Sequence, residues 1–302
     1  MRTRRTLAVA LCAIALTATA ACGKDGTPGA DKASAGGSAA PALPTYTVKT
    51  DVKLDSPALA AAKKRGQLII GAKSDQPFLG WEDLASGDRS GFDIEIAKMV
   101  AADLGFTPQQ IKWQTLVSSQ REPAISNGQI DFYVGTYSIN DERKKTVSFA
   151  GPYYVAGQDL LVKADNTAIT GPESVNGKNV CTATGSTSIK NIQQYSPKIT
   201  QFDTYSACVE KLMSGEVDAV TTDDAILKGY ASKYATKLKV VGKPFTKENY
   251  GVGLNKDDKA LRDAISDALK AHQDNGDWKK AYDATLGLSG STAPQPPVLE
   301  RY

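Results

Sequence analysis

The sequence predicts an α/β protein made of two similar lobes, and three observations favour this class. Helix-like and strand-like segments alternate from about residue 67 to residue 285, which is typical of helices packed against largely parallel sheets. A helix–glycine–strand block occurs twice along the chain. The part between the two low-complexity ends spans about 235 residues, which is long for one compact domain and suits two.

The first residues are typical of a secretory signal. Three arginines occur among the first five residues, an apolar run covers residues 7–16, and small residues lead to Cys22. The run is shorter than the ~20 residues that a membrane-spanning helix needs. We expect a signal peptide over residues 1–21. Because Thr19-Ala-Ala-Cys22 resembles a lipobox, we also expect a lipid on Cys22 that anchors the secreted protein to the outer face of the cytoplasmic membrane. The alternative is a plain signal peptide cut near Ala21.

Both ends of the secreted chain look flexible. Residues 23 to about 45 are mostly Gly, Ala, Ser, Pro and Thr, which bury too little apolar surface to offset chain entropy, so we expect a flexible tether over residues 22–55. Residues 289–302 are expected to form a disordered tail. Residues 1–21 hold three basic and no acidic residues, which leaves 33 of each sign elsewhere. This balance does not support a nucleic-acid surface.

Two cysteines remain for the folded part, Cys181 and Cys208, once Cys12 in the apolar run and Cys22 are set aside. An even count in a secreted chain predicts a disulfide. It would close a loop of about 28 residues, worth roughly 3.5 kcal/mol on the chain-entropy model. The alternative is a pair of buried thiols.

The first elements of the folded part follow from periodicity. Gln67-Leu-Ile-Ile-Gly71 predicts a buried strand. Residues 92–104 have apolar side chains at helical spacing, with Asp93 as the expected N-cap and Gly105 as the expected end.

The repeated block is Gly-Gln-Ile-Asp at residues 128–131 and Gly-Glu-Val-Asp at residues 215–218. Each glycine is expected to end a helix and each block to lead into a short strand. Thr136 and Asp223 stand at the same distance after the two glycines, at the carboxyl ends of the strands, where ligands bind in open α/β sheets. The alternative is a chance recurrence of a common pattern.

The chain is expected to cross between the lobes near residues 151–157 and 245–253. This places lobe 1 at residues 56–155, lobe 2 at residues 156–247 and the return to lobe 1 at residues 248–288. A two-strand connection of this kind permits hinge closure over a ligand in the cleft.

The sequence offers little for catalysis, so no catalytic residue, metal or cofactor is expected. The sole histidine, His272, lies in a charged helix-like stretch and is expected at the surface or at a helix end. No metal-ligand spacing occurs. Gly185-Ser-Thr187 lacks the lysine and the spacing of a phosphate-binding loop. These observations favour binding over catalysis.

A free amino acid requires a cation with N–H or O–H donors for its α-carboxylate, and a carboxylate for its ammonium group. Suitable side chains follow the predicted strands of both lobes, and two of them precede a helix-like segment whose free N–H groups can hold an anion. They are Thr136, Ser138, Arg143, Ser186, Thr187 and Asp223. The simpler interpretations are a solvated arginine, a turn aspartate and helix caps.

Several motifs, in order from about residue 57 to residue 286, resemble the polar amino-acid-binding proteins of ABC importers. They are Ser90-Gly-Phe-Asp-Ile-Glu-Ile-Ala97, Asn127-Gly-Gln-Ile-Asp131, Glu142-Arg-Lys-Lys-Thr-Val-Ser-Phe149, Gly151-Pro-Tyr-Tyr154, Gly185-Ser-Thr187 and Thr221-Thr-Asp-Asp-Ala-Ile-Leu227. The resemblance implies a two-lobed type II periplasmic-binding-protein fold. It also implies a monomer that delivers its ligand to a membrane permease and the permease's cytosolic ATPase.

The resemblance also assigns residue roles. It implies that Arg143 binds the α-carboxylate, helped by Thr136, Ser138 and Thr187, and that Asp223 binds the ammonium group. It places Phe78 and Trp81 near the ligand as aromatic walls, with lobe core as the alternative, and Cys181 and Cys208 resemble the second-lobe disulfide of the glutamate-binding branch.

Ligand choice depends on Lys73, just after the first strand, and on Arg121. In glutamate- and aspartate-binding relatives, basic residues at matching places contact the side-chain carboxylate. The match is partial, because Gln120 stands where relatives often have Asn and Lys73 replaces an Arg seen in some. L-glutamate is therefore the expected ligand, with aspartate or glutamine as alternatives; Lys73 and Arg121 also suit a strand end and a surface helix.

Two other functions remain open. One is a secreted enzyme on the same fold, of the cyclic-acid dehydratase type, for which Asp75, Glu82 and Asp224 are the candidate acids or bases. The other is a sensor subunit that delivers its ligand to a signalling receptor.

Overall fold

The computed structural model of the chain describes residues 41–302. The expected signal peptide and the lipidation of Cys22 lie outside the described residues. Within residues 41–302, no helix combines the length and apolar character needed to cross a membrane.

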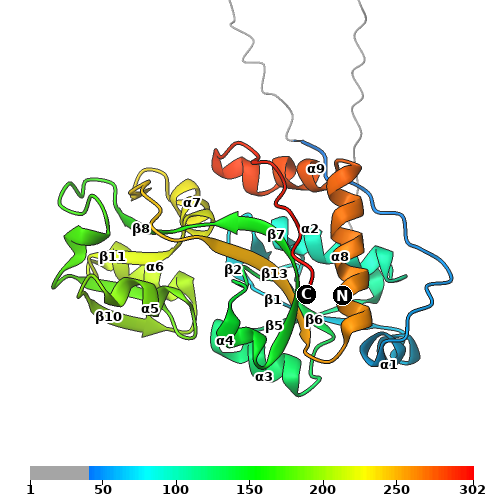
Figure 1. Ribbon diagram of the computed structural model, residues 1–302. Helices are drawn as coiled ribbons and strands as arrows, with labels where there is room; N and C mark the ends of the chain where they lie inside the picture. Colours follow the sequence, from blue (N-terminus) through cyan, green and yellow to red (C-terminus); the bar gives the residue numbers. More distant parts are fainter. Residues whose placement is uncertain (1–40) are drawn as a thin grey trace, which may run out of the picture. The chain divides into compact units, whose positions relative to one another are not determined.

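Two five-stranded sheets form the framework of the two lobes (Figure 1), with the orders β5-β1-β6-β13-β7 and β10-β9-β11-β8-β12. The first comprises β1 (Leu68–Ala72), β5 (Ile111–Thr115), β6 (Phe132–Tyr133), β7 (Val147–Ala156) and β13 (Glu248–Asn255). The second comprises β8 (Gln158–Lys163), β9 (Asn179–Ala183), β10 (Lys198–Phe202), β11 (Ala219–Asp223) and β12 (Leu238–Val240). A small third sheet comprises β2 (Asp75–Gln76), β3 (Gly80–Glu82) and β4 (Arg89–Ser90).

The two sheets share one pattern of pairing. In the first, β1 pairs in parallel with β5 and β6, and β13 pairs antiparallel with β6 and β7. In the second, β9 pairs in parallel with β10 and β11, and β8 pairs antiparallel with β11 and β12. The predicted α/β class with two similar lobes is therefore confirmed.

Helices cover the sheets. Lobe 1 has α1 (Pro57–Arg65), α2 (Phe92–Asp103), α3 (Arg121–Ser126), α4 (Asp141–Lys144), α8 (Lys259–Asp274) and α9 (Asp277–Ala284). Lobe 2 has α5 (Ser188–Gln193), α6 (Tyr205–Ser214) and α7 (Asp224–Lys233). Single 3-10 turns occur at η1 (Pro108–Gln110), η2 (Ser118–Gln120), η3 (Pro172–Val175) and η4 (Leu286–Ser289). The Phe92 ring of α2 packs edge to face against Trp278 and Tyr282 of α9, which stack on each other. These rings anchor the lobe 1 core.

Two helix ends behave as predicted and one helix start does not. Gly128 and Gly215 adopt left-handed φ angles of 64° and 86° after α3 and α6, a conformation that glycine adopts without steric cost. Asp93 was expected to cap α2, but Gly91 is the N-cap. The Asp93 carboxylate instead points inward and accepts a hydrogen bond from the Tyr153 hydroxyl at 2.7 Å, and burial raises the pKa of Asp93 to about 7.

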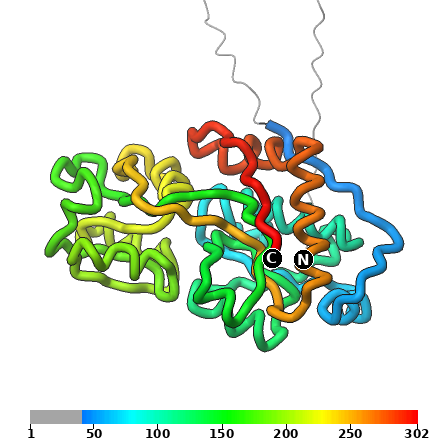
Figure 2. Tube along the Cα trace, viewed as in Figure 1, coloured from blue at the N-terminus to red at the C-terminus, as the bar shows by residue number. Residues whose placement is uncertain are grey.

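Within the described part of the chain, two segments run between the sheets. β7 continues into β8, and β12 leads back to β13 (Figure 2). The two segments lie side by side, because β7 and β13 pair along most of their length, from Glu248 opposite Ala156 to Asn255 opposite Val147.

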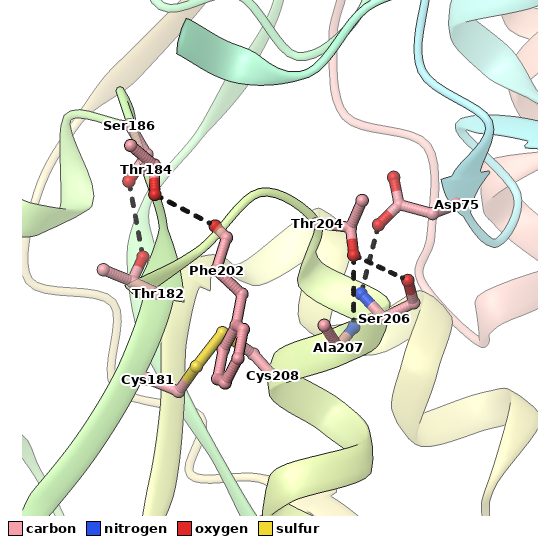
Figure 3. Close-up of a disulfide and its surroundings, with 10 residues drawn as sticks. All are labelled: Asp75, Cys181, Thr182, Thr184, Ser186, Phe202, Thr204, Ser206, Ala207 and Cys208. Atoms are coloured by element: carbon pink, nitrogen blue, oxygen red, sulfur yellow. Dashed lines mark hydrogen bonds between the residues drawn. A yellow bond between two sulfur atoms is a disulfide. The ribbon is translucent and has the colours of Figure 1, made fainter. Parts of the chain in front are cut away.

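The expected disulfide joins Cys181 on β9 to Cys208 on α6 (Figure 3). Both cysteines are fully buried. The bridge therefore fastens α6 to the second sheet, close to the loop that follows β9.

The structure corrects the expectation of a disordered tail at residues 289–302. This segment lies in extended form against lobe 1, where the Glu300 N–H donates to the Gly151 carbonyl at 2.8 Å and the Phe149 N–H donates to the Tyr302 hydroxyl at 2.8 Å. Composition alone predicts disorder here because the tail has few apolar residues. It does not take account of Tyr302, whose ring centre lies 4.5 Å from the Arg262 guanidinium carbon.

The expected tether at residues 22–55 is also too long. The Tyr46 hydroxyl donates to the Glu95 carboxylate at 2.9 Å, and the Lys49 N–H donates to the Ala102 carbonyl at 2.9 Å. Both acceptors are on α2, so the folded body begins several residues before α1.

Candidate functional site

A small cavity between the lobes contains most of the predicted site residues. Its free volume is about 10 Å³, close to the space of a single water. Lobe 1 contributes Ser118, Arg121, Thr136, Ser138 and Arg143, and lobe 2 contributes Ser186, Thr187, Ser188, Tyr205 and Asp223.

Thr136 lies in the loop just beyond the carboxyl end of β6 (Phe132–Tyr133). Its φ of 47° is unusual for a residue with a side chain and marks a constrained position. The Gln76 amide donates to the Thr136 hydroxyl at 3.2 Å. Ser138, two residues on, forms a backbone bridge with Tyr250, so strand β13 holds the segment that carries both hydroxyls.

Arg143 is buried and held on three sides. Its Nη1 donates to the Ser138 carbonyl at 2.8 Å and its Nε lies 3.0 Å from the Glu122 carboxylate. Its Nη2 donates to the Gly185 carbonyl of lobe 2 at 3.2 Å. Burial lowers the pKa of the guanidinium, and the nearby Arg121 lowers it further. The interpretation of Arg143 as a solvated surface residue is therefore wrong.

Arg121 approaches the same point from α3. Its Nη2 donates to the Gly185 carbonyl at 3.1 Å, while its Nε donates to the Ser118 carbonyl at 2.9 Å. The guanidinium carbons of Arg121 and Arg143 lie 4.4 and 4.9 Å from the centre of the Tyr137 ring. Two cations thus converge on one neutral carbonyl, an arrangement that attracts an anion.

Lys73 does not line the cavity but hydrogen-bonds to Ser118, which does. It is buried, and its Nζ donates to the Ser118 hydroxyl at 2.8 Å. Burial, followed by the nearby Arg121, lowers the pKa of Lys73 to about 7. The charges of Asp75 and Asp93 favour the ammonium form but do not offset burial, so the group is costly to keep charged.

Asp223 ends β11 on the opposite side of the cavity. The Tyr250 hydroxyl donates to its Oδ2 at 2.7 Å, whereas Oδ1 is buried without a partner among residues 41–302. Burial and then the charge of Glu248 raise the pKa of Asp223 to about 8. A buried carboxylate with a free oxygen is a site for a cation.

The loop after β9 brings lobe 2 close to lobe 1. A side chain at Gly185 would lie 2.7 Å from the Ser119 Cα, so only glycine allows this approach. The Thr187 hydroxyl donates to the Glu248 carboxylate at 3.1 Å, and Ser186 and Thr182 share a hydrogen bond of 3.3 Å.

The structure adds Ser118, Ser188 and Tyr205 to the lining of the cavity. Tyr205 begins α6, and burial raises the pKa of its hydroxyl to about 12, which keeps it a donor. Ser118 and Ser188 lie close in sequence to the predicted residues Arg121 and Thr187, which could have indicated them, whereas no predicted site residue lies near Tyr205.

Phe78 and Trp81 are not walls of this cavity. Both line a separate pocket of about 480 Å³, together with Ser232 and Lys233 of α7. The Lys233 Nζ lies 3.8 Å from the centre of the Trp81 ring.

Other residues that could act as an acid, a base or a metal ligand are paired with neighbouring side chains. Glu82 pairs with Arg89 at 2.7 Å and Asp224 pairs with Lys228 at 2.6 Å. His272 lies buried in the last turn of α8, where its Nδ1 is 3.0 Å from the Asp277 carboxylate. Among the described residues, no group of three or more His, Cys, Asp or Glu side chains is arranged to hold a metal.

The chain is similar to known proteins over most of its length. Residues 68–287 match the family model of the bacterial extracellular solute-binding proteins, family 3. The chain is 40% identical over 239 residues to the glutamate-binding protein GluB of Corynebacterium glutamicum, a match that covers 75% of this chain and 81% of that one. It is 37% identical over 226 residues to the ABC transporter glutamine-binding protein GlnH of Bacillus subtilis, covering 74% and 82%. A solved structure of an ancestral arginine-binding protein bound to glutamine is similar with a TM-score of 0.69 and 34% identity, covering 74% of this chain and 99% of that one.

Proposed function

The chain belongs to the bacterial extracellular solute-binding proteins of family 3, and we propose that it captures L-glutamate outside the cytoplasmic membrane and delivers it to an ABC permease. In this proposal a lipid on Cys22 anchors the protein to the membrane. The names of the relatives support an amino acid of the glutamate and glutamine group.

The charges around the cavity are the observation that favours glutamate over other amino acids. Arg121 and Arg143 meet at one carbonyl, Lys73 lies behind them, and Asp223 faces them with one unpartnered oxygen. Arg143 is partly balanced by Glu122, at 3.0 Å from its Nε, whereas Arg121 and Lys73 have no carboxylate hydrogen-bonded to them among residues 41–302. The two carboxylates and one ammonium group of glutamate complement these cations and Asp223. Glutamine lacks the second carboxylate, and an arginine side chain would be repelled by the cations.

We assign the contacts accordingly. Arg143, with Thr136, Ser138, Ser186 and Thr187, binds the α-carboxylate. Asp223 binds the ammonium group, and Arg121 and Lys73 bind the side-chain carboxylate. Charged hydrogen bonds of this kind are shorter and about twice as strong as neutral ones.

Ligand entry requires the lobes to separate, because a free volume of about 10 Å³ cannot hold an amino acid. We propose that the two segments between the sheets act as the hinge, with lobe 1 at residues 56–155 and 248–288 and lobe 2 at residues 156–247. The paired β7 and β13 strands would keep the motion to a rotation of one lobe on the other.

A thermal-shift panel of L-glutamate, L-aspartate, L-glutamine and L-arginine on residues 41–302 tests the proposal. A ligand at 100 times its Kd adds about 2.7 kcal/mol to the free energy of unfolding, which raises Tm by roughly 5–10 °C for a protein of this size. We expect the largest shift with glutamate. A shift with arginine and none with glutamate or aspartate would refute the assignment.

A further inference from the structure

A second contact between the lobes lies outside the ligand cavity. The turn from β2 to β3 in lobe 1 reaches α6 and α7 of lobe 2. The Asp75 Oδ2 accepts a hydrogen bond from the Ser206 N–H at 3.1 Å, in the first turn of α6 (Figure 3). The Tyr230 hydroxyl of α7 donates to the Asp75 carbonyl at 2.5 Å. None of these three residues lines the cavity.

Strand β3, which follows this turn, makes a second contact with α7 through Trp81. The Lys233 Nζ lies 3.8 Å from the centre of the Trp81 ring, within the range of a cation–π interaction. Burial lowers the pKa of Lys233. Phe78, in the turn between β2 and β3, has a left-handed φ of 63°, which is costly for an aromatic residue and is kept only where the surroundings enforce it.

Gly229 shows how closely the two lobes approach here. It lies inside α7 without a left-handed φ, so the helix itself does not require glycine. A Cβ at this position would lie 2.5 Å from the Pro77 carbonyl oxygen. Glycine is a poor helix former, so its presence is explained by the contact across the lobes and not by the fold of lobe 2.

The contact and the cavity share their supporting elements. Tyr205 of the cavity directly precedes Ser206, and Asp223 directly precedes α7. Gln76, adjacent to Asp75, donates to the cavity residue Thr136. Closing the contact therefore brings the ligand-binding side chains of both lobes into place.

We propose that Asp75, Ser206, Tyr230, Trp81 and Lys233 form an interlobe latch that sets how tightly and for how long the protein holds its amino acid. The latch does not touch the ligand. It favours the closed state by the same free energy whichever ligand is bound. It therefore changes the Kd values of all ligands by the same factor and leaves the ratio of the L-glutamate and L-glutamine affinities unchanged. This inference rests on the proposed function.

Gly229→Ala tests the latch, because the added methyl group holds the lobes apart and leaves every latch side chain in place. Alanine is the better helix former, so the Tm of the ligand-free protein stays level or rises. The Kd values for L-glutamate and L-glutamine both increase about tenfold, through faster dissociation, in calorimetry and stopped-flow measurements. Tyr230→Phe, which removes one hydroxyl donor, gives a loss of the same order. Lys228→Ala is the matched control on α7, since that side chain bonds only within its own helix.

Unchanged Kd values in both latch variants would overturn the proposal. So would a changed ratio of the glutamate and glutamine affinities, or a lower Tm for ligand-free Gly229→Ala. If the wild-type protein binds no amino acid, the proposed function fails and the latch is judged by small-angle X-ray scattering. In that case a larger radius of gyration for Gly229→Ala supports the latch, and equal radii refute it.

Discussion

Asp223→Asn should weaken ligand binding strongly and yet stabilise the ligand-free protein. The folded protein raises the pKa of Asp223 from 3.8 to about 8, first by burial and then through Glu248. At pH 7 the carboxyl group is ionised in the unfolded chain and takes up a proton on folding. At 1.36 kcal/mol per pKa unit, this costs about 4 kcal/mol.

The sign of the pH dependence follows from the raised pKa. The unfavourable contribution of Asp223 is absent below pH 4, grows between pH 4 and pH 8, and is constant above pH 8. Asparagine does not titrate, so the stability advantage of Asp223→Asn should grow by about 1.4 kcal/mol per pH unit across that window. Unmet hydrogen bonds of the new amide offset about 1–3 kcal/mol of the gain.

Urea unfolding at pH 5, 7 and 8.5 measures the stability difference, and calorimetry with L-glutamate measures binding. We expect the loss of a buried charge partner to weaken binding by about 2–5 kcal/mol. Asp267→Asn is the matched control, because that carboxylate is exposed, pairs with Arg301 at the surface and lies outside the cavity. A stability difference that is the same at pH 5 and pH 8.5, or wild-type affinity in Asp223→Asn, would refute the reasoning.

Three further predictions follow from other contacts. Arg121→Ala should weaken glutamate binding by about 2–5 kcal/mol and glutamine binding by less; equal losses in calorimetry would place Arg121 outside the side-chain site. Replacing Cys181 and Cys208 by serine should lower the free energy of unfolding by about 3.5 kcal/mol in urea titrations, and no loss would contradict the bridge. Tyr302→Ala should lower the free energy of unfolding by about 1 kcal/mol, or about 2–4 °C in Tm. Arg301→Ala breaks an exposed ion pair with Asp267 and should change the free energy of unfolding by less than about 0.5 kcal/mol. Equal effects of these two changes would show that the tail is not anchored by its last residue.

The sequence predicts those parts of the fold that depend on local rules. The left-handed glycines after α3 and α6 end their helices as expected, since the conformation belongs to the residue itself. The placement of Thr136 and Asp223 at or just beyond strand ends also follows, because position along a repeated block determines position on the sheet.

Features that depend on contacts between distant segments are not predictable in this way. Tyr205 enters the cavity from lobe 2, and no predicted site residue lies near it in sequence to signal this. Phe78 and Trp81 follow a predicted strand, but periodicity does not say whether the next turn faces the cavity or α7. The tail looks disordered by composition because its order depends on contacts with distant segments, such as those of Tyr302 with strand β7 and helix α8 and of Glu300 with Gly151.

Two ionisable groups at the cavity, Lys73 and Asp223, are buried without enough opposite charge around them. Lys73 and Asp223 are shifted toward their neutral forms, to pKa values of about 7 and about 8, because each is buried without a sufficient counter-ion. In the proposed binding mode, an amino acid with a side-chain carboxylate supplies an anion to Lys73 and a cation to Asp223, so binding would favour the charged form of both. At pH 7 to 8, Lys73 then takes up a proton while Asp223 releases one. These two proton exchanges have opposite effects on the pH dependence, so the affinity for an acidic amino acid stays nearly constant from pH 7 to pH 8. A ligand with a neutral side chain gives Lys73 no anion. Its binding is therefore weaker by the cost of keeping the buried Lys73 ammonium group charged.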